Sequence, residues 1–339
     1  MPAPLISFIV AACNAQSTLQ RTLGSLTTDV DPARCEVLVI DDGSTDDTVR
    51  IAQALCAINR NFRFFSQPNR GLGAVRNRGI DLANGEFVTF CDSDDMFLPV
   101  NYLTLAERTR AQGALVGVGL GFSLIENRAI EQFWDNEIVR VLKHLGPDPQ
   151  RSHLKFLVQP SAVPKIFDRR HVRETGLRFT EGRLFEDVEF TTGALLSTDK
   201  LCFEDLVLFF YDVRRNGSIT TDSSDRRFEI LDNVEPLLVR AAGCRLSTPQ
   251  SLCLTTVLLR TALWCLDNLP RQLRPQFAAR LVDTFRRYEF RADDAERRRL
   301  LPCILDRWDR RAFGVACEFW VARRERAALV KMLEAIQPC

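Results

Sequence analysis

The sequence lacks several features that would place it directly in a class of protein. It has no Cys-x-x-Cys pair, and its 11 cysteines are scattered among apolar neighbours. An odd number of widely spaced cysteines is not typical of a disulfide framework, so we expect reduced, mostly buried thiols in a cytosolic protein. No secretory leader is expected before Ile6. The spacing of His144, His153 and His171 does not suit a metal site.

The chain also has little net charge and no long hydrophobic run. Its formal net charge is +1, with 46% hydrophobic and 26% charged residues, which excludes a disordered chain and a globally basic nucleic-acid binder. The longest largely apolar stretch, 251–266, is too short for a membrane span and contains Arg260. Residues 271–330 carry fifteen arginines and nine acidic residues. This basic segment is typical of a solvated helix face and is also compatible with docking to an anionic membrane surface.

The first 120 residues alternate between strand and helix patterns. The sequence predicts strands at 5–12, 36–40, 62–65, 87–91 and 114–122, with helices at 14–26, 45–58, 73–83 and 101–112. Strands separated by helices of about a dozen residues indicate right-handed crossovers and a mainly parallel sheet. The pattern is mixed from 123 to 222 and helical after residue 224, with breaks near 243–247, 268–270 and Pro302.

The length of 339 residues suits one large domain or two fused ones. We therefore predict an α/β domain at 1–222, divided into halves 1–120 and 121–222. An all-α subdomain is predicted to follow at 223–339.

Three carboxylates, Asp92, Asp94 and Asp95, follow the strand predicted at 87–91. Like charges this close repel one another, so the cluster suits a bound cation. The alternative is that Asp and Ser here cap the next helix or make a turn. Taken alone, the segment favours neither interpretation.

Two more acids, Asp41 and Asp42, follow the strand predicted at 36–40. Because the carboxyl ends of parallel strands meet at one edge of the sheet, we expect both acidic segments to lie there, where ligands bind in open α/β sheets.

Between the two acidic segments, residues 69–79 combine a glycine-rich loop, a predicted helix start and three arginines. Backbone N–H groups at a helix start and guanidinium groups together suit a phosphate chain. The alternative for Arg70, Arg76 and Arg78 is surface salt bridging. Acids on one side and arginine with glycine on the other suit a ligand with both phosphates and a divalent metal.

Four ordered segments resemble family 2 glycosyltransferases. They are 7–15 (Ser-Phe-Ile-Val-Ala-Ala-Cys-Asn-Ala), 39–46 (Val-Ile-Asp-Asp-Gly-Ser-Thr-Asp), 69–79 (Asn-Arg-Gly-Leu-Gly-Ala-Val-Arg-Asn-Arg-Gly) and 90–95 (Phe-Cys-Asp-Ser-Asp-Asp). The resemblance is fainter at 185–190 (Phe-Glu-Asp-Val-Glu-Phe) and 211–220 (Tyr-Asp-Val-Arg-Arg-Asn-Gly-Ser-Ile-Thr). It implies a GT-A fold and an inverting transferase that moves a sugar from a nucleotide-diphosphate donor, expected to be a UDP-sugar, to a hydroxyl.

Carried over position by position, the resemblance implies site residues. It assigns Asp187 as the general base, Asp94 and Asp92 as ligands of a divalent metal (Mg²⁺ or Mn²⁺), and Asp41 as the contact to the nucleotide base. The nucleotide contacts that it implies are Ala12, Asn14, Asp41, Asp42, Asn69, Gly71, Arg76, Asp92 and Arg215.

Two alternatives concern the proposed base. Without the resemblance, residues 186–189 are typical of the first turn of a helix, where acids favour the helix dipole. Glu186 is the substitute base if Asp187 does not fill that role.

The chain departs from the family pattern at Ala11, where proline is usual, and at Cys13, where an aromatic residue is usual. The loss of an aromatic weakens stacking on the nucleotide base, so nucleotide preference stays open. The departures also keep one other class of function in view, a glycosyltransferase-like scaffold that binds a nucleotide without turnover.

The resemblance implies a place in polysaccharide or cell-surface glycan synthesis, with a glycan, lipid-linked or protein acceptor and no nucleic acid partner. We expect a cytoplasmic protein. The helical tail is expected to provide peripheral contact with the inner membrane face or a homo-oligomer interface.

Overall fold

The computed structural model describes residues 3–27, 31–125, 128–130, 133, 135–146, 149–213 and 224–287. The contacts between residues divide the chain into two compact units, one made of 1–146 with 161–215, and one made of 147–160 with 216–339. The predicted domain boundaries at 120 and 222 stay predictions.

The first unit is built on one sheet. Its described strands are β1 Ile6–Ala12, β2 Cys35–Asp42, β3 Phe62–Gln67, β4 Phe87–Asp92, β5 Met96–Phe97, β6 Val116–Ile125, β7 Arg128–Ile130, β8 Lys165–Asp168 and β9 Leu201–Asp212. Its helices are α1 Leu19–Ser25, α2 Thr48–Ile58, α3 Leu72–Leu82, α4 Pro99–Ala111, α5 Asn136–Leu145, α6 Arg169–Glu174 and α7 Glu186–Ser197.

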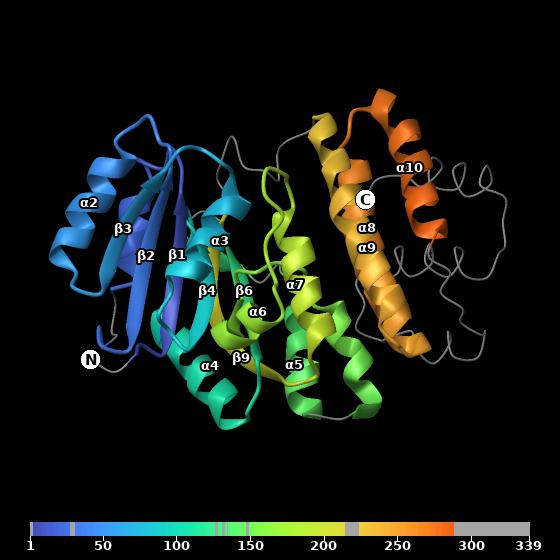
Figure 1. Cartoon of the computed structure of the whole chain (residues 1–339), viewed down its shortest axis with the longest axis horizontal. Coiled ribbons are helices and arrows are strands. Elements are labelled where there is room, and N and C mark those ends of the chain that lie inside the picture. Colours follow the sequence, from blue (N-terminus) through green and yellow to red (C-terminus); the bar gives the residue numbers. More distant parts are fainter. Residues whose placement is uncertain are drawn as a thin grey trace. The chain divides into compact units, whose positions relative to one another are not determined.

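The sheet is mixed, with order β3-β2-β1-β4-β8-β6-β9-β5 and β7 paired to β6. Strands β1 to β4 are parallel to one another, as the alternating pattern predicts (Figure 1). Strand β8 is antiparallel to both of its neighbours, whereas β6 and β9 are parallel. The α/β class and the mainly parallel sheet are therefore confirmed, with short antiparallel pairings at β5, β7 and β8.

Strands β4 and β8 pair over only two residues. Phe87 lies opposite Asp168, and Val88 lies opposite Phe167. The next residue, Thr89, donates its hydroxyl to the backbone carbonyl of Lys165 (2.8 Å). The remainder of β4, which ends at Asp92, has β1 as its strand neighbour within the described residues.

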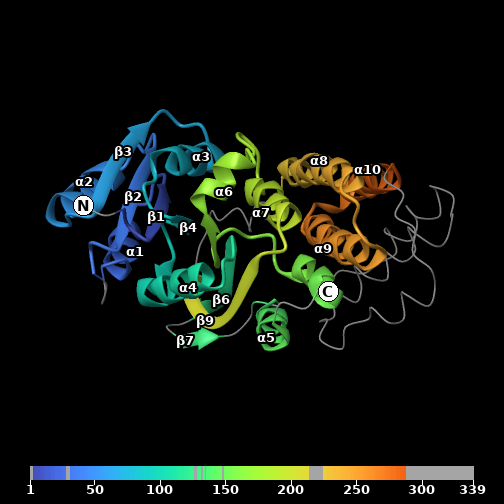
Figure 2. The same ribbon diagram turned by 60° about the horizontal axis from the view of Figure 1, so that its bottom comes forward.

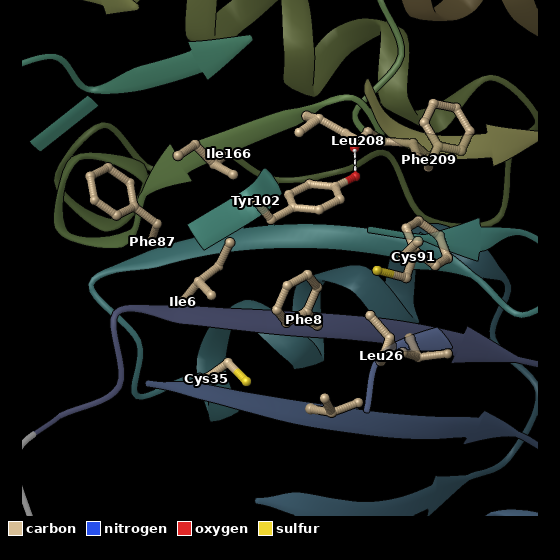
Figure 3. Close-up of a cluster of buried hydrophobic side chains, with 14 of the residues drawn as sticks. Ile6, Phe8, Leu26, Cys35, Phe87, Cys91, Tyr102, Ile166, Leu208 and Phe209 are labelled. Carbon is tan, nitrogen blue, oxygen red and sulfur yellow. Dashed lines mark hydrogen bonds between the residues drawn. The ribbon is translucent and has the colours of Figure 1, made fainter. Parts of the chain in front are cut away.

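Helices cover both faces of the sheet. One face packs against α1, α2 and α4 in a core that includes Phe8 and Tyr102, whose rings meet edge to face at 5.3 Å (Figure 3). Helix α3 covers the other face, where Gly79 lies so close to Ile9 that a Cβ would meet that side chain at 2.2 Å. Figure 2 shows α3 and α4 on opposite sides of the sheet.

Two predicted helices begin later than expected. The helix expected from residue 14 begins at Leu19, because Asn14 has φ +48° and starts a turn instead. The helix expected from residue 45 begins at Thr48, whose N–H is accepted by the side chain of Asp46 (3.0 Å).

The second unit is helical where it is described. Its elements are η1 Pro149–Leu157, η3 Asp225–Phe228, α8 Glu229–Gly243, α9 Thr248–Asp267, η4 Arg271–Leu273 and α10 Arg274–Arg286. Helices α8, α9 and α10 lie side by side (Figures 1 and 2), so the helical tail is confirmed to that extent. Most of the basic segment 271–330, with the break at Pro302, lies outside the described residues.

A buried carboxylate, Glu36, joins strand β2 to the turn before β4. It accepts hydrogen bonds from the Ser7 hydroxyl (2.6 Å) and from the backbone and side-chain N–H groups of Asn84. Burial alone would raise the pKa of Glu36, but these bonds and the charge on Arg63 outweigh burial and lower the pKa. The ionised side chain therefore stabilises the fold.

We predict that Glu36→Gln lowers the free energy of unfolding by about 1–3 kcal/mol at pH 7, because the buried donors lose a charged acceptor. A depressed pKa gives stability that is present above the ordinary value of 4.5 and is lost as pH falls below it. Urea unfolding of both proteins between pH 7 and pH 3 measures this, and the difference should shrink in acid. Glu107→Gln, which removes an exposed carboxylate paired with Arg34, serves as the control. A constant difference across this range would contradict the prediction.

Candidate active site

The acids predicted to share a sheet edge lie on the two neighbours of strand β1. In the strand register, Ala12 lies opposite Asp41 of β2, and Ala11 lies opposite Asp92 of β4. Ala12 and Asp41 are buried, whereas the side chain of Asp92 is 34% exposed. The parallel pairing therefore brings these acids level at the carboxyl ends of adjacent strands.

Asp42 holds the glycine-rich loop. One carboxylate oxygen accepts hydrogen bonds from the Gln67 amide (2.8 Å) and the Arg70 backbone N–H (3.0 Å), and the other accepts from the Gly71 N–H (2.8 Å). Gly71 precedes α3 with φ +88°, a conformation that favours glycine. The Asp42 carboxylate thus fixes the entry to α3. Its neighbour Asp41 accepts from the Ser66 hydroxyl (3.0 Å) and the Ser44 N–H (3.2 Å).

Asn14 and Cys13 follow strand β1 at the same edge. The Asn14 side chain accepts the Thr45 N–H (2.9 Å) and so joins the loops after β1 and β2. The Cys13 thiol is exposed, donates to the Asp42 carbonyl (3.6 Å) and accepts from the Asn69 amide (3.5 Å). Partial burial raises the pKa of Cys13, and the negative charges of Asp42 and Asp41 raise it further. The thiol is therefore protonated at neutral pH.

The three acids after β4 form a cluster. Asp92, Asp94 and Asp95 each offer a carboxylate oxygen, and these atoms lie within 4.8 Å of one another. Asp95 does not cap α4, because that helix begins at Pro99 with Leu98 as its N-cap. Its buried carboxylate accepts the Asp212 backbone N–H (3.2 Å), and burial, followed by the charge of Asp92, raises its pKa well above the ordinary value. Hard oxygen ligands in this number suit Mg²⁺ or Mn²⁺, so the residues fit the predicted metal.

Arg76 lies beside the acidic cluster, on α3. Its guanidinium donates to Asp92 (2.8 Å) and to Glu186 at the start of α7 (2.6 Å). The side chain is 3% exposed. Burial alone would lower the pKa of Arg76. The negative charges of Asp92, Glu186 and Asp187 outweigh burial and raise the pKa above its ordinary value. Arg76 therefore stays charged at every pH at which the protein is folded.

Asp187 lies in the first turn of α7, as the helix alternative predicts, next to the Glu186 that Arg76 binds. The side chain is half-buried, and within the described part of the chain it has no ion-pair partner. Burial raises the pKa of Asp187, Arg76 and Lys165 oppose that rise, and Asp92 adds to it. The carboxylate is thus a stronger base than an exposed aspartate.

Four phenylalanine rings hold α7 against the sheet. Phe190 of α7 stacks on Phe179 (4.1 Å between ring centres) and meets Phe90 of β4 (5.5 Å) and Phe167 of β8 (5.0 Å). Phe190 lies one helical turn beyond Asp187. Its burial therefore fixes where the first turn of α7 lies relative to β4.

The structure connects several of the predicted site residues and leaves one outside. Hydrogen bonds or register positions join the predicted residues at the ends of β1, β2 and β4 and in the Asn69 loop. Arg76 connects these residues to Asp187, because it binds Glu186, the residue before Asp187 in the chain. Arg215 lies outside the described residues. The contacts of all these residues with ligands stay predictions.

Two charged residues near Asp187 have contacts that the sequence did not predict, although Glu186 was expected as the substitute base. Glu186 is an arginine partner, and Lys165 is a fully buried cation that donates to the Ser161 carbonyl (2.7 Å). Burial lowers the pKa of Lys165 to about 8, opposed by Asp135 and Asp187. The only available signal for Lys165 was a charged residue beginning the otherwise apolar segment 165–167.

Comparison with known proteins identifies the part of the chain that carries the acids at the strand ends and Arg76. Residues 7–163 match the family model described as Glycosyl transferase family 2. This part of the chain belongs to family 2 of the glycosyltransferases. The resemblance seen in the sequence motifs is thereby confirmed.

One related sequence is Glycosyltransferase GlyA of Streptococcus pneumoniae serotype 4. It is 28% identical over 226 residues, which are 63% of this chain and 31% of GlyA. The chain thus spans less than a third of the length of that relative.

Solved structures support the GT-A fold. TarS 1-349 of S. aureus, crystallised with UDP-GlcNAc, is 18% identical with a TM-score of 0.71, covering 97% of this chain and 90% of that one. The mannosyltransferase PcManGT of Pyrobaculum calidifontis, crystallised with GDP-Man and Mn²⁺, is 17% identical with a TM-score of 0.52, covering 98% of this chain and 85% of that one. At these identities the likeness establishes the fold.

Among the helices in the described ranges, none is both long enough and apolar enough to cross a bilayer.

Gly73 provides a test of how closely α3 approaches the loop before α7. A Cβ at Gly73 would meet the carbonyl oxygen of Thr180 at 2.2 Å. Because the obstacle is backbone, we predict that Gly73→Ala lowers the free energy of unfolding by about 1–3 kcal/mol.

The matched control is Gly24→Ala in α1, where a Cβ has no atom within 4 Å. Alanine is the better helix former, so this variant should be unchanged or more stable by up to about 1 kcal/mol. Thermal or urea unfolding measures both variants. Equal stability of Gly73→Ala and the wild type would contradict the close approach.

Proposed function

We propose that the protein is an inverting glycosyltransferase that moves a sugar from a nucleotide-diphosphate donor, a UDP-sugar, to a hydroxyl acceptor. One observation carries the proposal. In a family 2 domain, an acidic cluster at the end of β4 is joined through Arg76 to a helix whose first turn presents Asp187. With these roles, the donor end and the proton acceptor would be adjacent.

The donor would lie along the edge formed by the ends of β1, β2 and β4. Asp41 would face the nucleotide base, with Ala12, Asn14 and Asn69 beside it. The Asp42 carboxylate, already bound by two backbone N–H groups, would act by keeping the Gly71 loop in place. Cys13 offers a small thiol where an aromatic ring would stack, so we expect hydrogen bonding rather than stacking to contribute most to base recognition.

A divalent cation would be held by Asp94 and Asp92, with Asp95 close enough to contribute. When bound, it would act as a Lewis acid that offsets the charge growing on the departing diphosphate. Asp95 also accepts the backbone N–H of Asp212 at the end of β9. That bond holds the cluster against the strand that leads into the predicted Arg215 loop.

Asp187 would act as the general base. Its carboxylate would take the proton of the acceptor hydroxyl while that oxygen attacks the anomeric carbon. The bond from the anomeric carbon to the diphosphate oxygen breaks, and its electron pair leaves with the diphosphate. A single displacement with one base and no covalent intermediate inverts the stereochemistry. The raised pKa of Asp187 favours its role as the proton acceptor.

The surroundings of this reaction stay proposals. The acceptor would be a glycan, a lipid-linked sugar or a protein in polysaccharide or cell-surface glycan synthesis. The helical tail is proposed to contact a membrane surface or a second copy, and a cytoplasmic location stays a prediction.

We predict that Asp94→Ala lowers metal-dependent turnover by about 100-fold or more, because the metal loses a ligand at the leaving diphosphate. Release of nucleotide diphosphate from a panel of UDP- and GDP-sugars, with Mn²⁺ and Mg²⁺ compared, measures it. Asp205→Ala, which removes an exposed carboxylate paired with Arg140, is the control. Equal metal-dependent turnover by Asp94→Ala and the wild type would exclude Asp94 as a required ligand.

Asp187→Asn should lower sugar transfer by about 100-fold or more, since an amide cannot accept the proton at this step. Binding of UDP should change by less than about threefold, because Asp187 lies on the acceptor side of the reaction. Calorimetry with UDP and Mn²⁺, together with a transfer assay, separates the two effects. Glu174→Gln, an exposed carboxylate change in α6, is the control.

The wild-type assays also test the proposed class of function. Binding of UDP with no turnover of any donor would refute the transferase and support the nucleotide-binding scaffold instead.

A further inference from the structure

We propose that Arg76 is a positioning residue: it holds the base-bearing turn of α7 against the acidic cluster, and it does not serve mainly as a ligand of the donor phosphates. This inference rests on the proposed transferase function. It assigns to Arg76 a different role from the nucleotide contact that the family resemblance implies.

The contacts of the guanidinium support this assignment. One terminal nitrogen binds Asp92 (2.8 Å) and the other binds Glu186 (2.6 Å), and the Arg76 side chain is 3% exposed. The group also lies 5.3 Å from the centre of the Phe179 ring. Two carboxylates therefore bind both terminal nitrogens and an aromatic ring lies near the group, so that only the buried Nε–H of this guanidinium is left without a hydrogen-bond partner among the described residues.

Other residues of α3 contact residues 179–181, in the loop that leads to α7. Asn77 donates to the Phe179 carbonyl (3.0 Å) and accepts the Phe179 N–H (2.8 Å), which is a two-way amide contact. Asn77 also donates to Glu181 (3.1 Å), which pairs with Arg70 of the loop before α3 (2.8 Å), and Gly73 allows the Thr180 carbonyl to approach closely. Helix α3 thus contacts consecutive residues of the loop, and Arg76 adds the contact to Glu186 on α7 itself.

A residue before the proposed base adds a reason for these contacts. Phe185 has φ +60°, in the left-handed region that a bulky residue rarely adopts. Such a conformation is strained and persists only where neighbouring contacts impose it. The next residue, Glu186, forms the ion pair with Arg76. Together with the stacking of Phe190 on Phe179, this pair fixes the turn that presents Asp187.

Catalysis depends on this position because the base must meet the acceptor hydroxyl while the metal cluster holds the diphosphate. A displacement of about 1 Å can cost about 100-fold in rate. Arg76 binds an acid of the cluster and the neighbour of the base, so it fixes the distance between them. Removing it should slow transfer while leaving the binding of the nucleotide largely intact.

The test uses Arg76→Met, with Arg76→Lys as the conservative variant. Methionine keeps the length and removes the charge, whereas lysine keeps the charge but cannot reach both carboxylates with a planar fork. Arg178→Met is the matched control, because Arg178 joins the start of the same loop to Asp81 of α3 through a largely exposed pair.

We expect Arg76→Met to lower kcat by about 10- to 100-fold and to change the affinity for UDP with Mn²⁺ by less than about threefold. Arg76→Lys should recover part of kcat, and Arg178→Met should match the wild type. Hydrogen exchange of residues 179–190, which requires no turnover, should become at least about tenfold faster in Arg76→Met.

Each contrary result is distinct. A loss of UDP affinity of about tenfold or more, with kcat unchanged, would make Arg76 a nucleotide ligand and overturn the inference. Unchanged exchange at 179–190 would overturn it as well. If the wild type turns over no donor, the proposed function fails, and UDP affinity and hydrogen exchange still decide the role of Arg76.

A second variant covers a failure of Arg76→Met to fold. In Arg76→Met/Glu186→Gln the buried carboxylate left by the first change is neutral, which removes the main cost of breaking the pair. The double variant should fold, bind UDP normally and show the same loss of kcat. Wild-type kcat in the folded double variant would overturn the inference.

Discussion

A positive charge buried between two carboxylates ties the parts of the candidate site together. Arg76 is shielded from water, and a buried charge costs several kcal/mol unless it is paired. Its partners Asp92 and Glu186 come from a strand end and a helix start that are far apart in sequence. If either carboxylate moved away, the buried charge of Arg76 would lose a partner at that cost. The strand that carries the acidic cluster and the helix that carries Asp187 are therefore held together.

The acids at the sheet edge divide into two kinds. Both carboxylate oxygens of Asp42 accept hydrogen bonds from protein groups at residues 67–71. Asp42 therefore holds the backbone of the loop before α3 in place. Asp92, at the end of β4, and Asp94, two residues later, are partly exposed, and Asp92 also binds Arg76. Asp95 lies between these kinds, since it is buried, bound to the backbone of β9 and still within the cluster.

The sequence predicted the parts of the fold that follow from local pattern. Alternating strands and helices gave the first four parallel strands, and the rule for strand ends brought Asp41 and Asp92 together. Pattern could not give β8 and β9, because their partners in the sheet lie far away in sequence. The Arg76–Glu186 pair was missed for the same reason, as a residue's ion partner depends on tertiary packing. The late start of α1 depends on the left-handed Asn14, which no periodicity records.

The short pairing of β4 with β8 has a consequence for how the site can vary. Backbone ladders require matched registers, and a slip of one residue turns every side chain to the other face. Beyond its two residues paired with β8, strand β4 contacts aromatic rings instead: Phe90 meets Phe167, Phe179 and Phe190. Contacts between rings, unlike a backbone ladder, do not require residues of two strands to be in register. The position of α7 beside the end of β4 therefore depends on the fit of these rings and on the Arg76 ion pairs, so a substitution that changes the size of a ring there can reposition Asp187.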